Sequence, residues 1–165
     1  GQGSTPHLAG ELLKLEADIN LTHVPYKGGS LATNDIVAGR VHAYFSGVAS
    51  VAPFVKAGKL RALVMTMPSR SATMPDVPTA AESGLPALDV SSWNGVMAPA
   101  KTPDAIVNRL YKEIAAIAGT EEMKAFLAKQ GLEPATMPPI KFGEAIRADL
   151  TRWAKVIKAA NIKVN

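Results

Sequence analysis

The stretch 21–46, LTHVPYKGGSLATNDIVAGRVHAYFS, constrains the fold of this chain more than any other part of the sequence. Residues 21–24 and 41–45, near its two ends, are short β-prone runs. Between them Ser30 is a candidate N-cap for a helix that Gly39 would end. Strand, helix and strand in this order predict a βαβ unit. Two parallel strands joined by a helical crossover imply an α/β layered domain.

Small and hydroxylated residues follow both expected strands. In parallel sheets, ligands collect outside the carboxyl ends of the strands, which here are residues 25–30 and 46–50. The N-terminus has a similar composition, because a glycine loop leads to Ser4 or Thr5 as the N-cap of a helix with Pro6 in its first turn. Free backbone N–H groups at such a helix start favour an anion, although a well-capped helix explains the same residues.

Composition narrows the class of protein. The chain has 165 residues, 47% of them hydrophobic and 19% charged, which is typical of one soluble globular domain or two small ones. The absence of cysteine excludes disulfides, thiol catalysis and thiolate metal sites. A net charge of +4 suits an anionic partner, but lysine and arginine are scattered, so no nucleic-acid groove is expected. No apolar run reaches the roughly 20 residues of a membrane span, and the first residues do not resemble a signal peptide.

The rest of the chain divides into a β-prone part and a helical part. A helix is expected at 50–57 and a buried parallel strand at 60–66, followed by a proline-rich irregular segment at 68–86 and an extended segment at 88–98. Three amphipathic helices then begin at Thr102-Pro103-Asp104, at Thr120 and near Ile140. Their apolar stripes need a sheet to cover, and this chain does not obviously supply one.

Catalytic signals are few. His7, His23 and His42 lie in different expected elements, and the sequence has neither an HExxH motif nor a nucleophile elbow around Ser46. Only His7, in the first turn of the N-terminal helix, is placed for ligand contact, whereas the other two histidines are expected to be structural. We expect no metal site and no cofactor.

Several separate blocks resemble one protein family. These blocks are GQGSTPHLAGELLK, HVPYKGG, KAGKLRALVMT, MPDVPTAAESGLP, SSWNGVMAPAKTP and the terminal WAKVIKAANIKVN. In this order they are similar to the periplasmic solute-binding receptors of tripartite tricarboxylate transporters, often called the Bug family, over essentially the whole chain. Members of that family are longer, two-lobed Venus-flytrap proteins that capture small carboxylates and related organic anions.

The resemblance implies an α/β, periplasmic-binding-protein-like fold with one lobe plus the terminal helices of the other. Residues 1–88 would be most of the second lobe, 89–98 a crossing or hinge segment, and 99–165 the helical end of the first lobe. That division accounts for the missing sheet. It also leaves apolar helices through which the chain could pair with another chain.

The resemblance also implies a site, partners and a compartment. Ligand carboxylates would be held by backbone N–H groups, hydroxyls and water at two loops, with residues Gly3, Ser4, Thr5 and His7 in the first and Ser46, Gly47 and Ser50 in the second. The implied partners are a small carboxylate and the membrane components of the transporter. The implied location is the periplasm, with the signal peptide absent from this chain.

Two departures from the family pattern stand out. Family members often carry an acidic residue and then asparagine around Ser46 and Gly47, and Met137-Pro138-Pro139 replaces the usual hydroxyl cap of the last helix. Two other classes also remain open. One is an α/β serine-dependent hydrolase with Ser46 or Ser4 as nucleophile, and the other is a helical interaction module.

Overall fold

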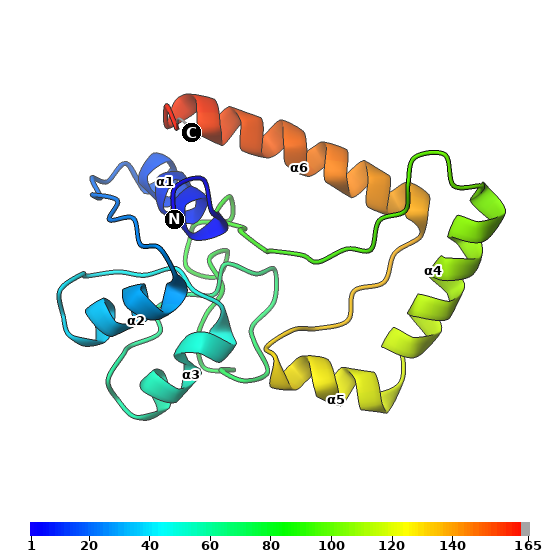
Figure 1. Cartoon of the computed structure of the whole chain (residues 1–165). Helices are drawn as coiled ribbons and strands as arrows, with labels where there is room; N and C mark the ends of the chain where they lie inside the picture. Colours follow the sequence, from blue (N-terminus) through cyan, green and yellow to red (C-terminus); the bar gives the residue numbers. More distant parts are fainter. Residues whose placement is uncertain (163–165) are drawn as a thin grey trace. The chain divides into compact units, whose positions relative to one another are not determined.

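A computed structural model describes residues 1–162. Helices joined by loops and extended segments make up this part of the chain (Figure 1). The helices are α1 (Thr5–Ala17), α2 (Gly29–Val37), α3 (Val48–Lys56), α4 (Asp104–Ala118), α5 (Glu121–Lys129) and α6 (Pro139–Ala159). In the described range no helix combines the length and apolarity that a bilayer crossing requires.

The chain divides into two compact units. The first contains Gly1–Ser92 together with the segment that begins at Trp153, and the second contains Trp93–Arg152. Helices α1, α2 and α3 therefore belong to the first unit, and α4 and α5 to the second. The long helix α6 runs through the second boundary.

Helix starts follow the sequence signals to within a few residues. Ser4 is the N-cap of α1, Pro6 lies in its first turn as expected, and Asp18 ends the helix in the left-handed conformation with φ 49°. Helix α2 begins at Gly29, so Ser30 lies inside the helix and is not its cap. Gly39 follows α2 with φ +71°, a conformation that glycine adopts at little cost.

Helix α3 begins earlier than predicted. It starts at Val48, where the sequence indicated residue 50, so Pro53 lies in the helix interior and not in the first turn. Proline has no N–H to donate to the carbonyl four residues earlier, which limits such a helix to a short length. Ala57 caps α3, and Gly58 follows it with φ +68°.

The predicted strands do not pair as a sheet. Within residues 1–162 the only β-bridge is an isolated parallel one between Met65 and Thr79, supplemented by a 2.8 Å bond from the Val90 N–H to the Thr66 carbonyl. The strands expected at 21–24 and 41–45, and the ladder that a buried strand at 60–66 would form with its neighbours, are therefore not formed in this part of the chain. Parallel strands depend on burial of both faces. That burial is missing, since Leu21, Val24 and Leu63 are 37%, 49% and 66% exposed.

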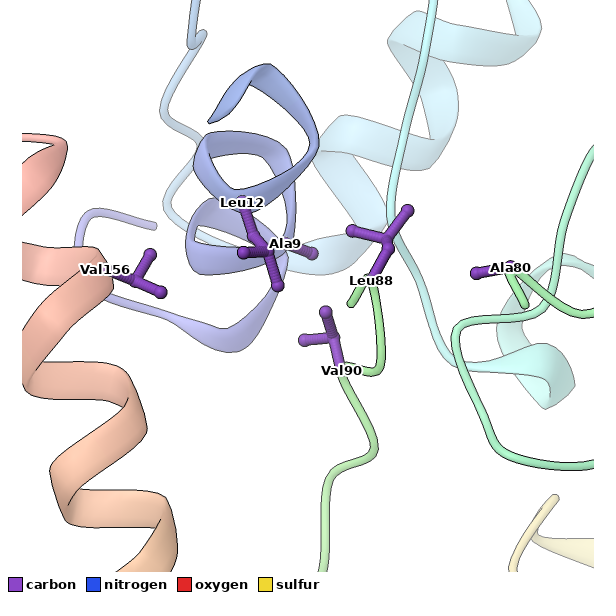
Figure 2. Packing of buried hydrophobic residues seen from close by; sticks show 6 residues of the cluster. All are labelled: Ala9, Leu12, Ala80, Leu88, Val90 and Val156. Carbon is purple, nitrogen blue, oxygen red and sulfur yellow. The ribbon is translucent and has the colours of Figure 1, made fainter. Parts of the chain in front are cut away.

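One small hydrophobic core organises the first unit. Figure 2 shows Ala9 and Leu12 of α1 near Val156 of α6 and the extended residues Leu88 and Val90. Leu88 is 1% exposed, and burying a leucine of this kind stabilises a fold by about 1.5–3 kcal/mol. This core anchors the start of α1 and therefore the loop that precedes it.

A capping box orders the proline-rich segment 68–86. Thr79 Oγ1 accepts from the Glu82 N–H at 3.2 Å, and Glu82 Oε2 accepts from the Thr79 N–H at 2.7 Å. Residues 79–83 form a hydrogen-bonded turn that starts from this box. Arg70 donates from Nε to both Glu82 oxygens, at 2.9 and 3.1 Å, and this hydrogen bonding, followed by the bond from the Thr79 N–H, lowers the pKa of Glu82.

The apolar stripes of the second unit are largely exposed. On α4 the predicted stripe is 39–53% exposed, with members Ile106, Leu110, Ile114 and Ile117. Phe126 on α5 is 56% exposed, and Leu150 on α6 is 67% exposed. The sequence did not obviously supply a sheet for these stripes to pack on, and within residues 1–162 no sheet covers them.

Candidate functional site

The first candidate loop is held by short local hydrogen bonds. Gly3 has φ +72°, and its N–H donates to His7 Nδ1 at 3.0 Å. Ser4 donates from Oγ to the Gly1 carbonyl at 2.6 Å, and its own carbonyl accepts from the Leu8 N–H at 3.0 Å. First-turn N–H groups of a helix have no intrahelical acceptor. The exposed first turn at Thr5 is therefore the part of α1 that can face an anion.

A stacked histidine pair lies beside this loop. The rings of His7 and His23 have centroids 3.8 Å apart and planes 14° from parallel. Because His7 Nδ1 accepts the Gly3 N–H, the neutral His7 ring carries its proton on Nε2, which lies 3.8 Å from Glu11 Oε1. Desolvation, and then the neighbouring His7, lower the pKa of His23.

His7 and Glu11 are both buried and border one cavity. It has a volume of about 430 Å³, and its lining includes Gln2, His7, Glu11, His23, Pro25 and Asn161. The second Glu11 oxygen pairs with Lys14 Nζ at 2.8 Å. This cavity therefore offers a neutral N–H donor and a carboxylate in close proximity.

The second candidate loop borders a different cavity. Ser46 is half-buried, Gly47 caps α3 in an extended conformation, and Ser50 lies in the first turn, where its N–H donates to the Gly47 carbonyl at 3.1 Å. Ser50 helps to line a cavity of about 330 Å³ together with Gly29, Ser30, Thr33, Asn34, Tyr44 and Phe54. The starts of α2 and α3 thus share one hollow edged by hydroxyl groups.

The segments on either side of α2 are tied to this helix through Asp35. Tyr26 donates its hydroxyl to Asp35 Oδ2 at 2.8 Å, and Arg40 donates to Asp35 Oδ1 at 2.7 Å. These bonds, that of Arg40 first, lower the pKa of Asp35, and the bond to Asp35 raises the pKa of Tyr26. Tyr26, in the segment expected at a strand end, is held against α2 in this way.

The structure groups the predicted site residues by loop. Gly3 and His7 share a hydrogen bond, whereas His7 and Ser50 line different cavities. Sequence reasoning missed Glu11, Tyr44 and the contact of His23 with His7. The spacing of His7 and Glu11, one helical turn apart, was the available signal for Glu11. Tyr44 and His23 carried no comparable signal, since only the folded chain brings them to the cavities.

The hydrogen bonds of Ser4 and His7 bear on the alternative of a serine hydrolase, and the grouping of histidine and acidic side chains bears on a metal site. The Ser4 hydroxyl donates to a backbone carbonyl, and His7 Nδ1 is already occupied by the Gly3 N–H, so the two do not form a nucleophile–base pair. Among residues 1–162 no three histidine or acidic side chains come together as metal ligands.

Comparisons with known proteins identify the family. The family model described as the tripartite tricarboxylate transporter family receptor matches residues 1–162. The chain belongs to this receptor family. It is 39% identical over its full length to the UPF0065 protein in the tcbD-tcbE intergenic region of Pseudomonas sp. strain P51, and 33% identical over 98% of its length to BugT of Bordetella pertussis. It spans about half of each relative, 49% and 50% respectively.

Solved structures give the same fold. One is Rpa4515 of R. palustris with adipate, with a TM-score of 0.80, 36% identity and coverage of 97% of this chain and 54% of that one. Another is MatC of Rhodopseudomonas palustris with bound malate, with a TM-score of 0.74, 29% identity and coverage of 94% and 54%. The expected periplasmic-binding-protein-like fold is confirmed, with this chain corresponding to about half of such a protein.

Proposed function

We propose that this chain is part of an extracytoplasmic solute-binding protein that captures a small carboxylate for a tripartite tricarboxylate-type transporter. The observation that carries the proposal is the family match over 1–162, joined to the structural likeness to proteins that hold adipate and malate. The proposed protein works in the periplasm and binds without catalysis. Its proposed macromolecular partners are the membrane components of the transporter.

The two candidate loops are the proposed contacts on this lobe. Gly3, Ser4, Thr5 and His7 would act at the start of α1, and Ser46, Gly47 and Ser50 at the start of α3. Each start presents backbone donors and the positive end of a helix dipole, which stabilises an anion by about 0.3–1 kcal/mol. The net charge of +4 adds a general attraction for anions.

We further propose the division into lobes that the resemblance implies. Residues 1–88 form most of the second lobe, 89–98 cross between lobes, and 99–165 are the helical part of the first lobe. The end of α6, from Trp153 on, nevertheless groups with residues 1–92 in the structure. The exposed stripe of α4 supports this division, because an apolar helix face of this kind normally packs on a sheet. The same face is a candidate surface for pairing with another chain.

A thermal-shift screen tests carboxylate binding. The panel contains mono-, di- and tricarboxylates, amino acids and aromatic acids. A ligand at a hundred times its dissociation constant adds about 2.7 kcal/mol to the free energy of unfolding. We expect a rise in Tm for one group of carboxylates. A cooperative melt with no rise for any of them would contradict a carboxylate site in this part of the protein.

Charge variants test whether the rise in Tm with a carboxylate arises at the starts of α1 and α3. Thr5→Asp and Ser50→Asp place an acid in the first turns of α1 and α3, where it favours the helix but repels an anionic ligand. We expect each variant to melt at or slightly above the wild-type temperature and to lose the carboxylate shift. Thr136→Asp, in an exposed segment of the second unit, is the matched control and should keep it.

A further inference from the structure

Two aromatic residues join the extended segment after Ser92 to α6. Trp93 donates its indole N–H to Asp149 Oδ2 at 2.7 Å, a contact between residues 56 positions apart in the sequence. The same indole meets the Phe142 ring edge to face, with centroids 5.1 Å apart and planes at 83°. Aromatic pairs of this geometry are favourable beyond the area they bury. All three residues belong to the second unit.

Gly95 allows this close approach. A Cβ placed on Gly95 would overlap Phe142 Cζ, and would lie 2.9 Å from Phe142 Cε1 and 3.3 Å from Trp93 Cζ3. Gly95 is not among the glycines with positive φ, so its backbone conformation is open to other residues. The packing against the Phe142 ring, and not the backbone, is therefore what requires glycine here.

The boundary between the units falls beside this arrangement. Ser92 is the last residue of the first unit before the chain enters the second at Trp93. On the other side, Asp89 Oδ1 accepts from both the Ser91 N–H, at 3.2 Å, and the Ser91 hydroxyl, at 2.7 Å. Ser92 thus lies between a local turn and the Trp93 contacts.

We propose that Trp93, Gly95, Phe142 and Asp149 form a clamp that fixes the crossing segment to α6 from Trp93 onward, so that bending within this segment is confined to Ser92. Hinges in two-lobed proteins are a few loop residues that absorb the backbone change, and small residues are common among them. The four clamp residues are positioning residues. The use of this hinge for ligand capture rests on the proposed function, but the clamp itself does not.

Backbone ¹⁵N relaxation on the whole 165-residue chain, without ligand, tests the clamp. We expect order parameters of about 0.85 for residues 93–98, equal to those of α6, and a lower value at Ser92. We also expect NOEs from the Gly95 Hα protons to the Phe142 ring. Low order parameters throughout 93–98, or absent NOEs, would overturn the proposal.

Variants separate the clamp from general stability. Gly95→Ala should lower Tm, abolish the Trp93 indole contact and reduce the order parameters of 93–98 to below about 0.6, while α4 stays unchanged. Asp149→Ala should loosen 93–98 without altering the space at Gly95. Gly10→Ala in α1, where an added Cβ meets nothing within 4 Å, is the control and should leave 93–98 rigid.

A double mutant tests whether the Phe142 ring is the group that an alanine side chain at position 95 would strike. Because Phe142→Ala removes the ring that an alanine at 95 would strike, Gly95→Ala should cost much less Tm in that background than in wild type. An equal cost in both backgrounds would overturn the role assigned to Gly95. A failed carboxylate screen would leave these results untouched, so the two proposals fail separately.

Discussion

Several polar side chains of the first unit form hydrogen bonds that hold neighbouring segments of the chain together. The proline-rich segment 68–86 is held together by hydrogen bonds among Thr79, Glu82 and Arg70. Asp35 accepts from Tyr26 and Arg40 and so ties the segments on both sides of α2 to that helix. Sequence reasoning missed the pairing of Thr79 with Glu82, although their spacing of three residues is that of a capping box. Arg70, whose Nε donates to both Glu82 oxygens from 12 residues earlier in the sequence, could be identified as the partner only in the folded chain.

Thr79→Ala should destabilise the first unit. Thr79 is 4% exposed and its hydroxyl accepts the Glu82 N–H, so the substitution removes a cap inside the fold. Losses of N-caps of this kind cost about 0.5–2 kcal/mol. Urea unfolding with an unchanged m-value would measure the difference. Thr73→Ala, in the same segment, is the control, and an equal loss there would contradict the importance of the cap.

The histidine pair predicts a pH dependence of stability. The pKa of His23 is lower in the folded chain than its ordinary value of about 6.5, so the unfolded chain binds the proton more readily. Stability from this group is therefore complete above about pH 6.5 and is lost as the pH falls through the folded pKa.

His23→Asn should flatten this part of the profile. Chemical denaturation between pH 5 and pH 8 would show a smaller fall in stability for the variant than for wild type. His42→Asn, another exposed histidine, is the control and should keep the wild-type slope. An identical slope in all three proteins would show that His23 is not responsible.

At the scale of elements, the helices were predictable and the sheet was not. Start signals such as Ser4-Thr5-Pro6 and Thr120 are local, and Thr120 indeed accepts from the Met123 N–H at 3.3 Å. Strand pairing depends on neighbours far away in sequence, and residues 60–66 form only one bridge. Helix periodicity correctly marked the stripe of α4 but carried no information on what covers it.

Leu110→Glu on α4 tests the exposed stripe. Leu110 is 46% exposed, so the free energy of unfolding should change by less than about 0.5 kcal/mol. If the stripe pairs with another chain, sedimentation velocity should show less self-association than in wild type. Asn108→Glu, two positions away on the same helix, matches the charge change and should leave association unaltered. A large loss of stability for Leu110→Glu would contradict the exposed assignment.

For the molecule as a whole, the order of the sequence blocks was enough to predict the family. For the ligand site, the sequence indicated only which loops contribute residues. The blocks predicted the receptor family and the fold, both of which the comparisons bear out. The assignment of ligand contacts to Gly3, Ser4, Thr5, His7, Ser46, Gly47 and Ser50 stays a prediction. The chain spans about half of its matched relatives, so its sequence carries signals for only its own share of the proposed site.

Carboxylate capture is tested most directly by a calorimetric titration with a matched pair of ligands. A short-chain dicarboxylate, drawn from the group that raises Tm, is compared with its diamide, which has the same length but no charge. Binding through backbone donors at helix starts predicts saturable heat for the dicarboxylate, none for the diamide, and loss of the heat in Thr5→Asp. Equal binding of both ligands, or no binding of the dicarboxylate, would contradict carboxylate capture by this part of the receptor.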